Sequence, residues 1–128
     1  MKIDIKIKGS AGHGFTITPA IHEYVTKRCE SFAKFLQHDP NALVTVELSK
    51  LTEHQKSGDI FSAEVHILAK IGGKSSDLYS SAERADLYAA IDAVKDEAFE
   101  ELSSTKAKNT TLDRKAGAEV KNILKGIK

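Results

Sequence analysis

Tyr88 and Asp92 are the polar side chains whose types and spacing best suggest a site. They lie four residues apart in an amphipathic segment, so a helix would place them on one flank. Leu87 and Ile91 belong to the apolar side of that helix, and core packing alone does not require the polar pair. Two interpretations stay open: the tyrosine packs between helices with a local hydrogen bond, or the pair contacts a partner directly.

Basic residues on the two expected helices form the second candidate set. They are Lys27, Arg28 and Lys34 near the polar side of the first helix, Arg84 and Lys95 on the second, and Lys106 and Lys108 at its end. Cations on one helical surface can bind the phosphates of a nucleic acid, with counterion release supplying much of the affinity. The pattern alone equally fits charges that only keep the helices soluble.

Enzyme signatures are weak throughout the chain. Gly9, Gly12 and Gly14 lack the Gly-Lys-Ser/Thr of a phosphate-binding loop, and Cys29 lies on an apolar helix face, where a thiol is inert. The histidines show no ligand spacing on one element; they are His13, His22, His38, His54 and His66. We therefore expect no enzyme activity, no catalytic residue, no metal, no cofactor and no small-molecule substrate.

Composition indicates one globular domain. The 128 residues are 41% hydrophobic and 29% charged, and no apolar run reaches the length of a membrane span. The N-terminal strand-like segment has no apolar signal-peptide centre, and a single cysteine excludes an internal disulfide. A cytoplasmic location, away from membranes, is the expectation.

Charge is unevenly distributed. Residues 1–105 hold 12 Lys/Arg and 16 Asp/Glu, a net charge of −4, whereas residues 106–128 hold seven Lys/Arg and two acids, a net charge of +5. Any attraction to a polyanion is therefore expected to be concentrated near the C-terminus.

Hydrophobic periodicity predicts the elements in the order β-α-β-β-β-α. The expected spans are strands at 2–8, 44–49, 61–69 and 75–81, and helices at 18–37 and 82–105, with Asn109–Thr111 ending the last helix and a short separate helix at 112–127. Thr18 and Pro19 form a helix start, and Gly72-Gly73 forms a tight hairpin turn. Loops are expected at 9–14 and 53–59.

The element order defines the fold class. A right-handed crossover makes the first two strands parallel, and hairpins make the others antiparallel. Because each strand alternates apolar and polar residues, one sheet face is buried, and both helices should cover it. The expected fold is α+β, a two-layer sandwich with a four-stranded mixed sheet.

Two motifs in the expected helices carry a family resemblance over residues 1 to about 108. They are Ile17-Thr18-Pro19-Ala20-Ile21 with Tyr24-Val25 and Arg28, and Asp86-Leu87-Tyr88-Ala89-Ala90-Ile91-Asp92. With these motifs the chain resembles the ribosome hibernation promoting factor family, also called ribosome-associated inhibitor or sigma-54 modulation proteins.

The resemblance implies a fold similar to double-stranded RNA-binding domains and two partners, the small ribosomal subunit with its RNA and the whole ribosome. It implies binding in the small-subunit channel near the decoding centre during stress or stationary phase. Messenger and transfer RNA would be excluded sterically, which silences idle ribosomes without catalysis.

The chain departs from the family pattern in three places. Lys95 is followed by Asp96, Glu97, Glu100 and Glu101, where relatives usually carry several Lys/Arg. The loop from Gly9 to Thr16 is longer than usual. Only about twenty residues follow the core, which is too few for the dimerisation domain of the long family form, so the short form is expected.

The sequence therefore predicts a ribosome-binding translation inhibitor, with one domain at 1–106 and a basic, partly helical tail at 107–128. The predicted RNA contacts are Lys27, Arg28, Lys95, Lys106, Lys108, Arg114 and Lys115. The alternative is a protein–protein interaction module on the same fold, whose acidic second helix meets a basic partner.

Overall fold

The computed structural model describes the backbone of residues 1–7, 16–52 and 59–126, and the side chains of residues 1–7, 16–50 and 60–110. The predicted loop at 9–14 and residues 53–58 of the loop predicted at 53–59 lie outside the described residues, and Asp59 belongs to a strand instead. The elements in chain order are β1 (Lys2–Ile7), α1 (Pro19–Cys29), the short 3-10 turn η1 (Glu30–Phe32), α2 (Ala33–Leu36), β2 (Leu43–Thr52), β3 (Asp59–Ile71), β4 (Lys74–Arg84) and α3 (Leu87–Gly126).

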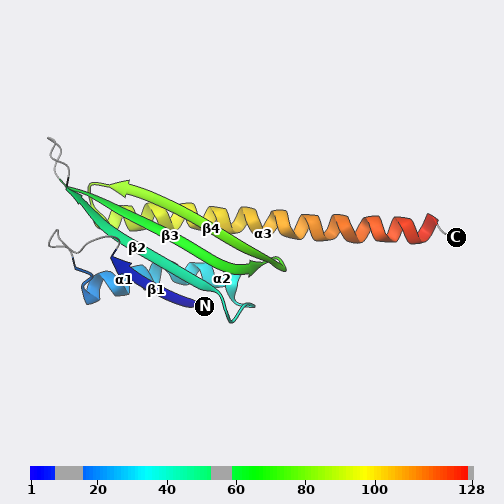
Figure 1. The fold of residues 1–128 in the computed structure, drawn as a ribbon, viewed down its shortest axis with the longest axis horizontal. Helices are drawn as coiled ribbons and strands as arrows, with labels where there is room; N and C mark the ends of the chain where they lie inside the picture. Colours follow the sequence, from blue (N-terminus) through cyan, green and yellow to red (C-terminus); the bar gives the residue numbers. More distant parts are fainter. Residues whose placement is uncertain (8–15, 53–58, 127–128) are drawn as a thin grey trace.

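The sheet has the strand order β1-β2-β3-β4. β1 pairs with β2 in parallel, and the β2–β3 and β3–β4 pairs are antiparallel. All the helices lie on one face of this sheet: α1 lies beside β1, α2 contacts β3, and α3 runs along β3 and β4 (Figure 1). The predicted α+β sandwich is confirmed, because alternating strands leave one apolar face that only helices can cover.

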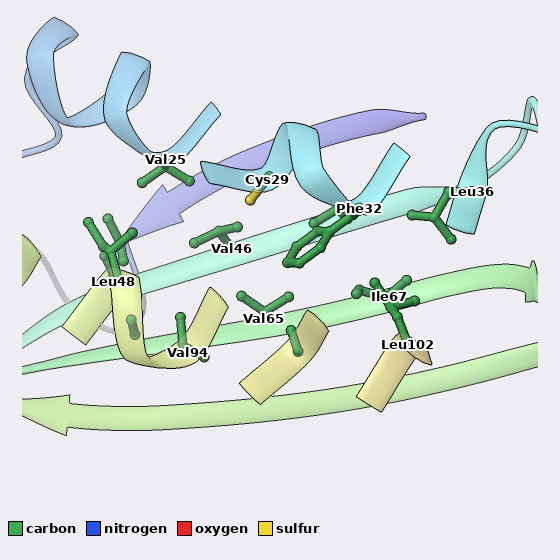
Figure 2. Close-up of a cluster of buried hydrophobic side chains, with 14 of the residues drawn as sticks. Val25, Cys29, Phe32, Leu36, Val46, Leu48, Val65, Ile67, Val94 and Leu102 are labelled. Carbon is green, nitrogen blue, oxygen red and sulfur yellow. The ribbon is translucent and has the colours of Figure 1, made fainter. Parts of the chain in front are cut away.

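The core fills the space between the sheet and the helices (Figure 2). From Val44 to Leu48 in β2 and from Ala63 to Ile71 in β3, every second side chain is buried, as Val46 and Val65 show. Phe32 and Leu36 close the core from the α1–α2 side, and Leu102 closes it from α3. This packing fixes which flank of each helix remains on the surface.

The first helix begins as predicted. The hydroxyl of Thr18 accepts a hydrogen bond from the backbone N–H of Ile21 at 3.2 Å, and Pro19 occupies the first turn. The prediction of one continuous helix to residue 37 was wrong, because η1 separates α1 from α2. Beside this break, the Ser31 hydroxyl donates to the carbonyl of Arg28 at 3.0 Å, a local bond that competes with regular helix geometry.

The last helix differs more from the prediction. β4 is longer than expected and continues to Arg84, so α3 begins at Leu87 rather than near residue 82, and the Asp86 carboxylate accepts from the N–H of Ala89 at 3.0 Å. The predicted break at Asn109–Thr111 and the separate helix at 112–127 were also wrong. α3 is continuous to Gly126, across the predicted domain boundary, and projects beyond the sheet (Figure 1).

Asn109 explains why the helix does not end there. Its side chain is 8% exposed, and its amide donates to the carbonyl of Ile71 at 2.7 Å. Gly72 and Gly73 form the predicted hairpin turn with φ of 59° and 83°. A Cβ on Gly72 would lie 2.9 Å from that of Asn109, so the helix packs directly on the turn. Because its amide has a buried hydrogen-bond acceptor, Asn109 can lie within the helix instead of ending it.

No helix among the described residues is long and apolar enough to cross a membrane. α3 has the length, but charged residues recur along it.

Candidate nucleic-acid interface

α1 and α3 meet through a polar and aromatic cluster on the surface. The rings of Tyr24 and Tyr88 pack edge to face, with centroids 4.8 Å apart. The Tyr24 hydroxyl donates to Oδ1 of Asp92 at 2.7 Å, joining residues 68 positions apart. Tyr88 therefore packs its ring against Tyr24 of α1 but remains 39% exposed, and the hydroxyl bonded to Asp92 belongs to Tyr24 rather than to Tyr88. The first interpretation holds only for the ring contact.

Arg28 completes this cluster. Its Nη2 donates to the Tyr24 hydroxyl at 3.0 Å, and its Nε lies 3.0 Å from Oδ1 of Asp92. The hydrogen bond to Tyr24, and then the negative charge of Asp92, raise the pKa of Arg28 above its ordinary value. Both partners of the ion pair remain almost half exposed, so a phosphate can reach the guanidinium but must compete with a carboxylate already bound to it.

A second cluster lies where α2 faces α3. Phe35 and Phe99 pack edge to face at a centroid distance of 5.2 Å. The Nζ of Lys34 lies 5.5 Å from the Phe35 centroid and 5.7 Å from that of Phe99, and the Nζ of Lys106 lies 5.8 Å from Phe35. The two rings hold two exposed ammonium groups over one aromatic surface, which suits a phosphate beside a stacked base or sugar.

Lys34 was absent from the predicted contacts. The sequence placed it near the polar side of the first helix, but gave no reason to prefer it to the other surface lysines. What distinguishes it is the pairing of Phe35 with Phe99, which joins distant parts of the chain. A lysine beside an aromatic residue on a helix is the only sequence signal that could have indicated this site.

Two further predicted contacts have carboxylate neighbours on their own helices. Lys27 and Glu23 are 3.1 Å apart, with both side chains more than two-thirds exposed. Lys95 and Asp96 are 2.7 Å apart, and the Lys95 side chain is only 24% exposed. Such pairs lower the local positive potential, so these lysines offer less net charge to a polyanion than the sequence count suggested.

The remaining predicted contacts do not form one surface. Lys106 and Lys108 are two positions apart on α3, which places them about 200° apart around the helix. Lys106 faces α2, so Lys108 lies on the opposite flank. The side chains of Arg114 and Lys115 lie outside the described residues. The described cation surface therefore consists of Lys27, Arg28, Lys34, Lys95 and Lys106.

Cys29 and His66 are among the reactive side chains that the structure describes, whereas His13 and His54 lie outside the described residues. Burial raises the pKa of the Cys29 thiol to about 12, with the charge of Lys95 opposing the shift, and the side chain is 3% exposed. His66 pairs with Asp77 on the open face of the sheet. Among the described residues, no group of three or more His, Cys, Asp or Glu is placed to hold a metal ion.

The family follows from a comparison with known proteins. A family model described as sigma 54 modulation protein / S30EA ribosomal protein matches residues 10–110, which include both helical clusters. The chain belongs to this family. Members of the sigma 54 modulation protein / S30EA family are ribosome-associated factors, and the predicted resemblance is confirmed.

Individual relatives agree with the family. Proteins named ribosome hibernation promoting factor from Klebsiella oxytoca and from Salmonella typhimurium (strain LT2) are each 28% identical over 97 residues, covering 76% of this chain and 90% of the relative.

Solved structures agree as well. The crystal structure of the Thermus thermophilus Protein Y N-terminal domain is 27% identical, has a TM-score of 0.54 and is matched over 99% of its length and 82% of this chain. A ribosomal subunit interface protein from Coxiella burnetii, 17% identical with a TM-score of 0.58, covers 84% of this chain and 99% of its own and shows the shared fold.

Proposed function

We propose that this protein binds the small ribosomal subunit, occupies the channel near the decoding centre, and silences idle ribosomes by excluding messenger and transfer RNA. The observation that carries the proposal is the family match across residues 10–110, since it spans the whole helical surface. The relatives named ribosome hibernation promoting factor support the same role. Action in stress or stationary phase is consistent with that name.

The helical surface has features that favour RNA. Lys34 and Lys106 lie over an aromatic pair. Arg28 lies six residues before Lys34, and both side chains approach residues of α3. Phosphate contacts of this kind need no base sequence, so recognition would follow the shape of folded RNA. Binding by rigid helices rather than by a catalytic pocket suits a steric role, in which occupancy itself inhibits.

The acidic residues after Lys95 limit where RNA can lie. Asp96 and Glu100 are exposed on α3 and would repel phosphates that approach its solvent side. The RNA backbone is therefore expected to follow the junction between α1–α2 and α3, where Arg28, Lys34 and Lys106 lie. This placement concentrates the interface on fewer cations than the sequence predicted.

Co-sedimentation with purified ribosomes tests the proposal. The protein should pellet with small subunits and with whole ribosomes, and the affinity should fall steeply between about 50 and about 300 mM salt, because phosphate contacts release counterions. Bound protein should also lower the binding of a labelled messenger RNA and an initiator transfer RNA in proportion to occupancy. Absence of co-sedimentation at low salt would contradict ribosome binding, and undiminished RNA binding at full occupancy would contradict occlusion.

The basic C-terminal segment is proposed to add affinity. Removal should begin after Thr110, because Asn109 anchors α3 to the hairpin and an earlier cut would damage the fold. The shortened protein should bind ribosomes several-fold more weakly at low salt, with a shallower salt dependence. Equal affinity and equal salt dependence would show that residues 111–128 make no contact.

A further inference from the structure

The outer edge of β4 is a long strand edge that pairs with no other strand among the described residues. β4 is the last strand of the sheet order, and its register with β3 is continuous from Lys74 to Arg84. Eleven residues thus present alternate backbone N–H and C=O groups away from β3. Natural edge strands are usually short, bulged or interrupted by proline or inward-pointing charges. Within β4 there is no proline, and the unbroken register leaves no bulge.

One flank of α3 runs beside this edge and carries two carboxylates, with Lys108 further along the same flank. Tyr88, Asp92 and Phe99 face α1 and α2. At about 100° per residue, Glu97 and Glu101 fall on the opposite flank, which is the β4 side of the helix. Both side chains are exposed. The free edge and the two carboxylates therefore border the same strip of surface.

On the open face of the sheet, across β4 from these carboxylates, an aromatic side chain is exposed. Tyr79, in the middle of β4, is 58% exposed and projects from the open face of the sheet, where it donates to the carboxylate of Glu64. A β-branched residue on a neighbouring strand packs well against such a ring. A strand added at this edge would thus lie between Glu97 and Glu101 on one side and the ring of Tyr79 on the other. This arrangement suits a strand whose successive side chains point to opposite faces.

We propose that the free edge of β4 binds an extended, lysine- or arginine-containing segment of a partner protein, which adds a fifth strand to the sheet. Main-chain hydrogen bonds to β4 hold the segment, as in other strand-addition complexes. Its basic side chains point to Glu97 and Glu101, and its intervening apolar side chains lie beside Tyr79. Charge complementarity selects this occupant where the flank carries Glu97 and Glu101, about two to three turns before Lys108.

This docking edge is separate from the cation surface. Arg28, Lys34 and Lys106 lie at the junction between α1–α2 and α3, whereas Glu97 and Glu101 face away from it. RNA and a basic strand would therefore occupy opposite flanks of α3 at the same time. Glu97 and Glu101 have a partner-selecting role that is distinct from the phosphate repulsion assigned to Asp96 and Glu100, and the inference does not depend on ribosome binding.

The test uses the intact protein and a synthetic peptide of about nine residues that alternates lysine and valine. Fluorescence anisotropy measures its binding at low salt, and hydrogen exchange measures the amides of β4. We expect saturable binding, with alternate amides of β4 protected about tenfold or more by the added strand. Two peptides N-methylated on opposite sets of alternate amides should differ, because only one set faces β4.

Charge-reversal variants complete the test. Glu97→Lys/Glu101→Lys should weaken peptide binding by about fivefold or more, as expected for two lost surface ion pairs. Asp96→Lys/Glu100→Lys makes the same charge change on the solvent side of α3 and should weaken it much less. Equal weakening by both variants, equal binding of the two N-methylated peptides, protection outside β4, or no binding at low salt would each overturn the proposal.

Discussion

Replacing Asp92 by asparagine should strengthen RNA binding, although it removes a contact between helices. In the free protein Asp92 lies 3.0 Å from the Nε of Arg28 and accepts from Tyr24 at 2.7 Å. A phosphate that binds Arg28 must displace this carboxylate or share the guanidinium with it. Asparagine keeps the shape and can still accept from Tyr24, but it leaves the charge of Arg28 uncompensated.

The size of the effect follows from counterion release. One additional phosphate contact steepens the dependence of log K on log salt by about 0.7 to 0.9. At about 0.1 M salt this corresponds to a gain in affinity of roughly five- to eightfold. The free energy of unfolding should change little, because the side chains of both Arg28 and Asp92 are almost half exposed to solvent.

Co-sedimentation with ribosomes over a range of salt concentrations measures both the affinity and the slope. Glu100→Gln is the matched control, because it removes one negative charge from the solvent side of the same helix. It should increase affinity less and leave the slope unchanged. In the double variant Arg28→Gln/Asp92→Asn the gain should disappear, since it acts through the freed guanidinium.

Two results would refute this reasoning. Weaker binding of Asp92→Asn at every salt concentration would mean that Asp92 positions Arg28 for RNA instead of competing with it. An unchanged slope with unchanged affinity would mean that Arg28 lies outside the interface.

Three other predictions concern the second cluster, the helix anchor and the thiol. Lys34→Gln and Lys106→Gln should each reduce the salt slope of ribosome binding by about 0.7 to 0.9, measured by co-sedimentation, and an unchanged slope for either excludes that lysine from the interface. Asn109→Ala should lower the free energy of unfolding by about 1–3 kcal/mol in a denaturant titration, because the carbonyl of Ile71 loses its buried donor; a loss below the fitting error would contradict the anchor. Cys29 should resist iodoacetamide at about pH 8 until the protein is unfolded, and modification at the rate of a free thiol would contradict its burial. Because its folded pKa of about 12 exceeds the unfolded value, its share of stability is present at neutral pH and lost as the pH rises from about 9 towards 12, which Cys29→Ala should abolish in alkaline unfolding curves.

The fold was predictable because its signals are local. Alternation in the strands, the Thr18-Pro19 helix start and the Gly72-Gly73 turn each act within a few residues, and together they require a sheet with one buried face. The predicted limits of β4 and the predicted start of α3 were wrong because the local signal is weak there. Ser-rich β4 has a weak strand pattern, and it becomes a full strand only because β3 pairs with all of it.

The candidate site likewise has features that the sequence predicts and features that it does not. The sequence by itself determined the family motifs, the uneven charge and the apolar face of each helix, since these depend on residue type and period. Only the tertiary structure decided that Tyr24 meets Asp92, that Phe35 gathers two lysines, and that Asn109 continues a helix by bonding the carbonyl of Ile71. Each of these depends on contacts between residues far apart in the chain, and a local pattern cannot specify which distant partner will satisfy a polar group or neutralise a charge.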